Sequence, residues 1–432
     1  MRLLLDNVGK IAKADIEING ITVIAGENNT GKSTIGKILY CIFDSFYCIE
    51  DQIFKERKIS INRVINNYYH ETTDRLTRRF DASNIAAYIV EQKDLYLKNS
   101  NLLEKELENF YMQSDENFTK YISKNALEST VSKIRDYLEI TDDEIRKVIL
   151  RKRLLAEFNM KIGHVNFIDI ISHILLEIKD KKIEINIKSN DEIMINSYIS
   201  LVKELVYIDD PFILDDLNAK VFKFINPYNS LDHRHNLLLK LGENGNKENE
   251  FSVLDEISVN KKLDKIMNAI NDVCDGDLLS NDEHSIYVYK TNKLKEALDI
   301  SNLSTGMKNF VIIRTLLKNG SINDNGIIVL DEPEIHLHPE WQLKFAEIIV
   351  LIQKEFGANI LLNTHSPYFL NAIEVYSNKH QISKKCKYYM TEEIEGRANI
   401  LDVSNNIEKI YEKLSRSLQE LESLEYRDDK CK

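Results

Sequence analysis

The stretch GENNTGKST at residues 26–34 decides how the rest of this sequence is interpreted. It satisfies the spacing G-x-x-x-x-G-K-[ST], in which glycines let backbone N–H groups surround phosphate oxygens without a Cβ in the way. The partial positive charge at the start of a following helix adds to the attraction. The expected binding residues are Gly26, Asn28, Asn29, Thr30, Gly31, Lys32, Ser33 and Thr34.

The segments on either side of this loop support the same prediction. Residues 1–25 alternate apolar and polar side chains, which predicts two or three short strands. Residues 35–55 have helical periodicity, so the loop joins a strand to a helix. In that context Lys32 supplies a charge for the β- and γ-phosphates of a nucleotide, and the Ser33 hydroxyl can ligate Mg²⁺.

Two later apolar segments end in side chains suited to phosphate chemistry. IIVLDE at 327–332 predicts a buried strand that places Asp331 where it can hold Mg²⁺ through water and Glu332 where it can polarise an attacking water. NILLNTHSP at 359–367 brings His365 to the same edge of the sheet, within reach of the γ-phosphate. The alternatives are solvated charges at a strand end and a structural histidine.

LSTGMK at 303–308 predicts a second phosphate site at a helix N-terminus, with Ser304 and Gly306 as its residues. Taken alone, such a tripeptide is usually a helix cap. One chain cannot easily bring both helix ends to one nucleotide, whereas two chains arranged head to tail can. The motif therefore predicts a homodimer or a higher oligomer in which each chain completes its partner's site.

Together these four motifs resemble the ABC-type ATPase head, in particular the branch with SMC-type heads, RecF-like proteins and the ATPase halves of OLD-family nucleases. The longer string LDEPEIHLHPEWQ…THSPYFL is similar to the bacterial AAA_15/AAA_21 family, many members of which occur in anti-phage systems such as Septu, Gabija and retron-associated operons. The resemblance implies ATP and Mg²⁺ as cofactors, Glu332, His365 and Lys32 as catalytic residues, and Ser33 and Asp331 as metal ligands. It also implies that Glu334, His336 and His338 lie in the D-loop region at a dimer seam.

The departures from that pattern narrow the expected function. Thr305 stands where transporters usually carry glycine, and no glutamine loop is evident, with Gln52 and Gln92 as weak candidates. The sequence lacks the sustained heptad repeats of a long coiled coil, so none is expected. Only about 65 residues follow His365, too few for a TOPRIM nuclease domain, and CDGD at 274–277 is interpreted as a turn. No nuclease site is expected within the chain.

The expected fold is α/β: an ABC-ATPase-type P-loop head with an N-terminal antiparallel β edge and a large, mainly helical insert. Residues 55–200 are predicted to be mostly helical. The expected divisions are 1–55 and 296–400 for the two parts of the ATPase core, 56–295 for the insert and 401–432 for a C-terminal helix.

Composition excludes some classes of protein. The 432 residues are 43% hydrophobic with a net charge of −12, which argues against a protein that coats nucleic acid over its whole surface. No apolar run approaches the roughly 20 residues of a membrane span, and no leader pattern is present, so a cytoplasmic protein with no membrane partner is expected. The five cysteines are scattered and predict neither a metal site nor disulfides.

The expected function is that of an ATP-dependent dimeric sensor or clamp that controls a separate effector, such as a nuclease, in anti-phage defence. Two alternatives stay open: a repair or recombination clamp that binds nucleic acid, and a scaffold that binds ATP with little turnover. Basic clusters at 74–80 and 146–153 could contact nucleic acid or form a solvated, salt-bridged helix face. The histidines of HRH at 233–235 are weak candidates for metal ligands.

Overall fold

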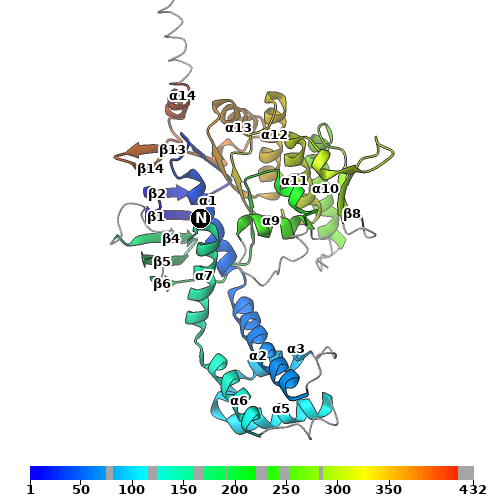
Figure 1. Ribbon diagram of the computed structural model, residues 1–432. Coiled ribbons are helices and arrows are strands. Elements are labelled where there is room, and N and C mark those ends of the chain that lie inside the picture. Colours follow the sequence, from blue (N-terminus) through cyan, green and yellow to red (C-terminus); the bar gives the residue numbers. More distant parts are fainter. Residues whose placement is uncertain are drawn as a thin grey trace, which may run out of the picture. The chain divides into compact units, whose positions relative to one another are not determined.

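The structure is a computed structural model that describes residues 1–73, 81–114, 124–159, 170–189, 192–219, 232–242, 253–281 and 286–416. The chain divides into two compact units. Unit 1 comprises residues 1–47 and 150–432, and unit 2 comprises residues 48–149. Figure 1 labels the elements of both.

Unit 1 is built on a sheet of eleven strands in the order β6-β5-β4-β1-β2-β14-β13-β3-β12-β11-β7. Its first half is antiparallel from β6 to β2. These strands are β1 (Arg2–Val8), β2 (Ile11–Glu17), β4 (Ser172–Ile178), β5 (Lys181–Ser189) and β6 (Glu192–Ser197). Strand β14 (Arg397–Asp402) pairs with β2 in parallel and with β13 antiparallel, so it joins the two halves of the sheet.

The second half of the sheet is entirely parallel. Its strands are β13 (Cys386–Ile394), β3 (Ile21–Ala25), β12 (Asn359–Thr364), β11 (Ile327–Asp331) and β7 (Leu205–Ile208). All five residues of β3 and all four of β7 are buried. Such continuous apolar strands are typical of a parallel sheet that is covered on both faces.

Helices cover this parallel half and share one large apolar core with it. Helix α1 packs on β7, β11 and β12, and α12 packs on α10 and α13. Ser304, Pro339 and Ser366 stand at the N-terminal boundaries of α11, α12 and α13, and Gly357 ends α12 at φ +64°. The helices of unit 1 are α1 (Lys32–Phe46), α8 (Ile213–Asp216), α9 (His233–Gly242), α10 (Val253–Asn271), α11 (Thr305–Lys318), α12 (Pro339–Phe356), α13 (Pro367–Lys379) and α14 (Glu408–Leu414).

A small antiparallel sheet of β8 (Asp277–Asn281), β9 (Ile286–Lys290) and β10 (Leu298–Asp299) lies in the sequence just before α11. Asp277, the last residue of CDGD, accepts a hydrogen bond of 2.7 Å from Arg314 Nε and pairs with Lys318. Asp275 pairs with Thr291 and Lys293. These carboxylates are held in ion pairs, and Asp277 begins β8, so the prediction that CDGD forms a turn is wrong.

Unit 2 is helical and has its own apolar core, centred on residues such as Ile61, Leu103 and Ile134. Arg57 is buried there. Its guanidinium donates to Tyr137 O and Ile140 O, at the end of one helix, and to the carboxylate of Asp142, where the next helix begins. The helices are α2 (Ile49–Thr73), α3 (Ser83–Glu91), α4 (Lys93–Lys98), α5 (Ser100–Ser114), α6 (Lys124–Glu139) and α7 (Asp142–Phe158), the last of which continues into unit 1.

The α/β class and the strand–loop–helix context of residues 26–34 are confirmed. The prediction of mostly helix over 55–200 is wrong for residues 172–197, which form β4, β5 and β6 and extend the antiparallel edge. The physical reason is visible in KKIEINIK at 181–188, where every second residue is an isoleucine that faces the core. No helix among the described residues is both long enough and apolar enough to cross a membrane.

Candidate functional site

Apart from Ser304 and Gly306, the predicted site residues converge at the carboxyl edge of the parallel strands in unit 1. Thr364 at the end of β12 is in register with Ala25 at the end of β3, and Asn363 is in register with Asp331 at the end of β11. Gly26, Glu332 and His365 directly follow these strand ends. In open α/β sheets this edge is where ligands bind.

The backbone of the phosphate loop includes left-handed turns and a close packing contact that favour glycine or asparagine. Gly31 has φ +86° and Asn29 has φ +63°, both in the left-handed region. A Cβ on Gly26 would lie 1.8 Å from Thr391 Oγ1, so this position also requires glycine. Thr30 Oγ1 donates to Glu27 O at 2.8 Å and stabilises the turn of the loop. Thr34 N bonds Gly31 O at 3.1 Å, at the start of α1.

Lys32 is held inside this loop. Its side chain is only 4% exposed, and Nζ donates to Gly26 O at 3.0 Å and to Glu27 O at 2.8 Å. Burial lowers the pKa of Lys32, and the nearby carboxylates of Glu332 and Asp331 act in the opposite direction. A buried ammonium is costly unless it is paired with a negative charge, so Lys32 is well suited to bind an anionic ligand.

Glu332 lies between the side chains of Lys32 and His365. Its Oε1 is 3.6 Å from Lys32 Nζ and 3.5 Å from His365 Nδ1. Glu332 itself has φ +51°, a left-handed conformation that is uncommon for glutamate and that turns the chain sharply after β11. The structure thus brings together the three side chains that the sequence selects as catalytic.

Glu334 supports the segment that carries His365, and its place at a dimer seam stays a prediction. Its side chain is buried, accepts a hydrogen bond from Thr364 Oγ1 and another from His365 N at 3.3 Å, and lies 4.0 Å from His365 Nδ1. Burial raises the pKa of this carboxyl. Glu334 therefore orients the turn that carries His365, whereas the His336 and His338 side chains are exposed.

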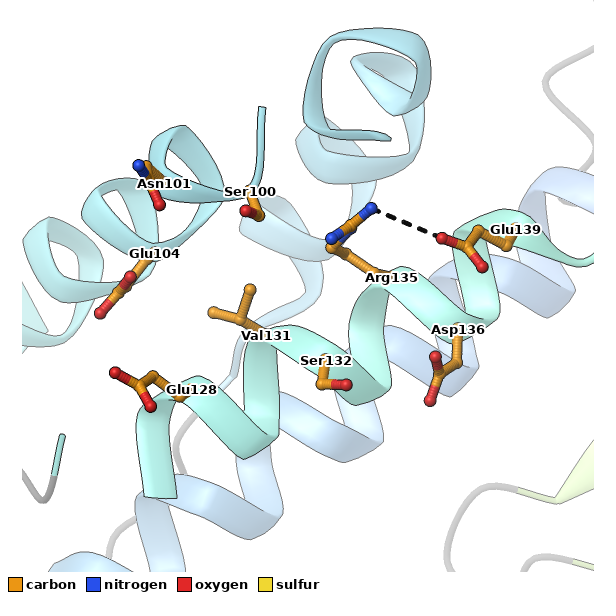
Figure 2. Close-up of a pocket in the computed structure, with 9 residues that line it drawn as sticks. All are labelled: Ser100, Asn101, Glu104, Glu128, Val131, Ser132, Arg135, Asp136 and Glu139. Atoms are coloured by element: carbon orange, nitrogen blue, oxygen red, sulfur yellow. Dashed lines mark ion pairs between the residues drawn. The ribbon is translucent and has the colours of Figure 1, made fainter. Parts of the chain in front are cut away.

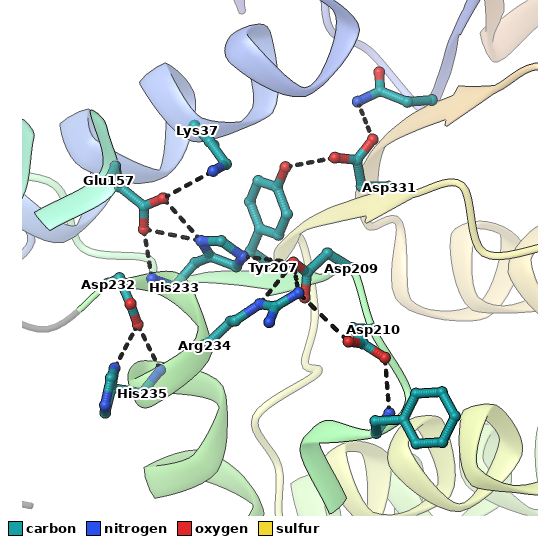
Figure 3. A network of polar contacts seen from close by, with 12 residues as sticks. Lys37, Glu157, Tyr207, Asp209, Asp210, Asp232, His233, Arg234, His235 and Asp331 are labelled. Carbon is teal, nitrogen blue, oxygen red and sulfur yellow. Dashed lines mark hydrogen bonds and ion pairs between the residues drawn. The ribbon is translucent and has the colours of Figure 1, made fainter. Parts of the chain in front are cut away.

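Asp331 accepts one hydrogen bond on each carboxylate oxygen. Tyr207 Oη donates to Oδ2 at 2.9 Å (Figure 3). Asn363 Nδ2 donates to Oδ1 at 2.9 Å. Neither donor is among the site residues predicted from the sequence. Tyr207 lies on β7, 124 residues before Asp331 in the chain, and its strand becomes a neighbour of β11 only through the sheet order.

The HRH segment is part of a polar network beside Asp331 (Figure 3). His233 is 4% exposed and bonds Glu157 Oε2 through Nδ1 at 2.8 Å and Asp209 Oδ2 through Nε2 at 3.0 Å. His235 Nδ1 pairs with Asp232 at 2.7 Å. Both histidines are thus engaged with carboxylates, and no group of three or more His, Cys, Asp or Glu in the described part of the chain has a metal-site arrangement. This geometry favours an ion-pair role over a metal site.

Stability is expected to depend on pH through His233. Burial acts to lower its pKa, but hydrogen bonds with Asp209 and Glu157 outweigh it and raise the pKa to about 9 from 6.5. The stabilisation is therefore complete below pH 6.5 and is lost as the pH rises through about 9; it amounts to about 3 kcal/mol. Urea unfolding at pH 6.5 and 9.5 measures the loss. The loss should be absent from His233→Gln and retained in the neighbouring His235→Gln; an equal loss in all three proteins would contradict the assignment.

Ser304 is the N-cap of α11, and its Oγ accepts a hydrogen bond from Met307 N at 3.4 Å. A Cβ on Gly306 would lie 3.0 Å from the Trp341 ring and 3.1 Å from His336 O, so the first turn of α11 packs closely on the segment after β11. Among the described residues, no hydrogen bond or ion pair joins Ser304 or Gly306 to the phosphate loop. Their proposed role across a dimer stays a prediction.

The remaining sequence candidates lie elsewhere. The basic cluster at 74–80 falls outside the described residues. In the cluster at 146–153, Arg146 pairs with Asp143 and Arg153 pairs with Asp44, which supports the salt-bridged helix face over a nucleic-acid contact.

Unit 2 contains a cavity of about 320 Å³ between α5 and α6 (Figure 2). Four carboxylates line it, and Arg135 pairs with Glu139 at 3.5 Å within it. None of the predicted site residues is among its lining, because all of them belong to unit 1.

The residues at the carboxyl edge fit ATP and Mg²⁺. The loop backbone adopts left-handed φ at Asn29 and Gly31, the conformation of a phosphate-binding turn, and Lys32 offers a buried positive charge. The Ser33 hydroxyl and the Asp331 carboxylate are oxygen donors of the kind Mg²⁺ prefers, and a phosphate-bound Mg²⁺ needs only one or two protein ligands.

Comparison with known proteins gives the following matches. The family described as "AAA_21: AAA domain, putative AbiEii toxin, Type IV TA system" matches residues 21–371. A relative named "Retron Vc95 probable ATPase" from Vibrio cholerae serotype O1 biovar El Tor is 25% identical over 380 residues, which cover 82% of this chain and 67% of the relative. "Septu protein PtuA" from Bacillus thuringiensis is 36% identical over 85 residues, only 17% of this chain and 21% of that protein.

Among solved structures, the SMC head domain from Thermotoga maritima aligns with 93% of this chain and 98% of its own, at 11% identity and a TM-score of 0.39.

Proposed function

Because the chain belongs to the AAA_21 family of AAA domains, we propose that it is an ATPase that binds ATP and Mg²⁺ at the carboxyl edge of β3, β12 and β11 and hydrolyses the nucleotide. The observation that carries this proposal is the convergence of Lys32, Asp331, Glu332 and His365 at one sheet edge. Among the described residues these come from three strand ends that are adjacent in the sheet and far apart in the sequence.

The residues divide the work of hydrolysis as follows. Bound Mg²⁺ would neutralise phosphate charge, and Ser33 and Asp331 are its proposed ligands. Lys32 and the loop N–H groups bind the β- and γ-phosphates, after which Glu332 is released from Lys32 to accept a proton from the attacking water. His365 stays beside Glu332, where its ring can contact the γ-phosphate.

We assign the second half of the site to another copy of the chain. The N-terminus of α11, with Ser304 and Gly306, offers backbone N–H groups and the positive end of a helix dipole to an anion. A head-to-tail dimer would bring this helix end to the nucleotide of its partner. Nucleotide binding would then control association, which is how a clamp or sensor converts ATP into a change of assembly.

The biological role we propose is control of a separate effector protein, such as a nuclease, in anti-phage defence. The names of the Vibrio and Bacillus relatives, a retron ATPase and a Septu protein, support this role. In the cluster at 146–153, Arg146 and Arg153 pair with carboxylates, which makes these two side chains less suited to contact nucleic acid.

The proposal is tested on the chain expressed together with its genomic neighbours and tagged at one terminus. We expect ATP to shift its mass in solution to that of a dimer or a larger assembly, and we expect a neighbour with nuclease chemistry to co-purify. Lys32→Ala, which removes the buried charge, should remove the ATP-dependent shift. A dimer that instead carries nucleic acid and no protein partner would support the repair clamp, and a mass that ATP leaves unchanged would contradict the dimer.

A further inference from the structure

A buried chain of contacts connects the Asp331 carboxylate to α7, which continues from unit 2 (Figure 3). Its first member is Tyr207, which is 2% exposed and donates to Asp331 Oδ2 at 2.9 Å. The Tyr207 hydroxyl is the donor in this bond, because the Asp331 carboxylate accepts. With Asn363 on the other oxygen, the plane of the carboxylate is fixed.

The second member is His233, at the start of α9. Its ring lies against that of Tyr207, with 4.3 Å between the centroids and 42° between the planes. His233 is held from both sides by carboxylates, Glu157 on Nδ1 and Asp209 on Nε2. Because both ring nitrogens are bonded, the imidazole cannot turn, and it fixes the position of the tyrosine ring.

The third member is Glu157, in the last turn of α7. Its carboxylate is completely buried, accepts from the backbone N of His233 at 2.5 Å and lies 3.9 Å from Lys37 Nζ. Lys37 is on α1, the helix that follows the phosphate loop. Glu157 is thus bonded to the residue behind Tyr207 and paired with the helix that begins at Lys32.

We propose that Tyr207 and His233 are positioning residues that hold the Asp331 carboxylate ready for a nucleotide-bound metal ion, and that Glu157 ties this pair to α7. The inference rests on the proposed function, since it concerns the metal ligand of that site. None of the three touches the reacting atoms. They act through the orientation of Asp331, in the way that outer-sphere groups orient the ligands of a metal.

The test measures how much Mg²⁺ strengthens nucleotide binding. The dissociation constant of a fluorescent ATP analogue is determined with Mg²⁺ and with EDTA for the wild type and for Tyr207→Phe, which removes only the hydroxyl. We expect about 10-fold weaker binding in Mg²⁺ and unchanged binding in EDTA, because loss of an outer-sphere group weakens metal binding by roughly 10- to 100-fold. A loss of overall stability would change both values together.

Tyr289→Phe is the matched control. Tyr289 is 1% exposed in the same unit, and its hydroxyl accepts from Gly276 N at 2.7 Å, away from Asp331. It should bind the analogue as the wild type does in both conditions. Equal Mg²⁺ dependence in Tyr207→Phe and the wild type would overturn the inference while leaving the proposed function intact, provided that Lys32→Ala still weakens binding. Failure of the wild type to bind the analogue would overturn both.

A double-mutant cycle tests whether His233 acts through Tyr207. His233→Gln should also weaken binding in Mg²⁺, and adding it to Tyr207→Phe should cause no further loss, because its path to Asp331 is already cut. If the losses of Mg²⁺-dependent affinity in the two single variants add fully in the double variant, His233 does not act through Tyr207. Where His233→Gln does not fold, Tyr207→Phe alone decides the inference.

Discussion

Replacing Glu332 with glutamine is expected to lower the rate of ATP hydrolysis by about 10²- to 10³-fold and to leave ATP binding intact. A general base contributes an acceleration of this size, and glutamine keeps the shape of the side chain but cannot accept the proton. The turn at φ +51° is retained by an isosteric side chain. Phosphate release at saturating ATP measures the rate, and equilibrium binding of the same nucleotide measures the affinity.

The same variant should accumulate the ATP-bound assembly, since binding proceeds and turnover does not. The control is Glu340→Gln in the first turn of α12, an exposed glutamate that lies outside the predicted site. It should hydrolyse ATP at the wild-type rate. Undiminished hydrolysis by Glu332→Gln would show that another group activates the water, and His365, 3.5 Å from the same oxygen, would be examined next.

Replacing Lys32 with alanine is expected to weaken ATP binding by roughly 10- to 100-fold, the loss of one charge-assisted hydrogen bond to a phosphate. The unliganded protein should still fold, because the change removes a charge whose pKa burial lowers. Calorimetric titration with ATP and Mg²⁺ measures the affinity, and thermal unfolding without nucleotide checks the fold.

Lys265→Ala is the control for charge. Lys265 is 62% exposed and pairs with Glu355 at 2.8 Å on α12, away from the loop. It should bind ATP as the wild type does. Full ATP binding by Lys32→Ala would mean that residues 26–34 are not the phosphate loop, and the site assignment would fall with it.

Local pattern was enough to predict the strands and helices that carry the chemistry. The loop at 26–34, Asp331 with Glu332, and His365 each follow an apolar run, and the parallel register brings those runs to one edge. Polar residues at strand ends can be recognised in the sequence because the edge of a parallel sheet is a shared location. The roles assigned to these residues stay predictions until the variants are measured.

The residues that orient the site could not be selected in the same way. Tyr207 reaches Asp331 only because β7 pairs with β11, and Glu157 reaches His233 from a helix 76 residues earlier. LVYIDD at 205–210 is a third apolar run that ends in carboxylates, as IIVLDE does. This pattern could have indicated that the strand at 205–208 also reaches the edge where the site lies. The strands at 172–197 were missed because residues 55–200 were interpreted as one mostly helical region. The two-residue period of 181–188 is short within that region.

The order of strands in the sheet also has a consequence during synthesis. β3 is complete at Ala25, but its two neighbours are β12, which begins at Asn359, and β13, which begins at Cys386. At about 5–20 residues per second, a ribosome takes roughly 17–67 s to reach the first of them. Throughout that time the apolar segment ITVIA has neither edge paired. The nascent chain must therefore keep this segment from aggregating before the nucleotide site can begin to assemble.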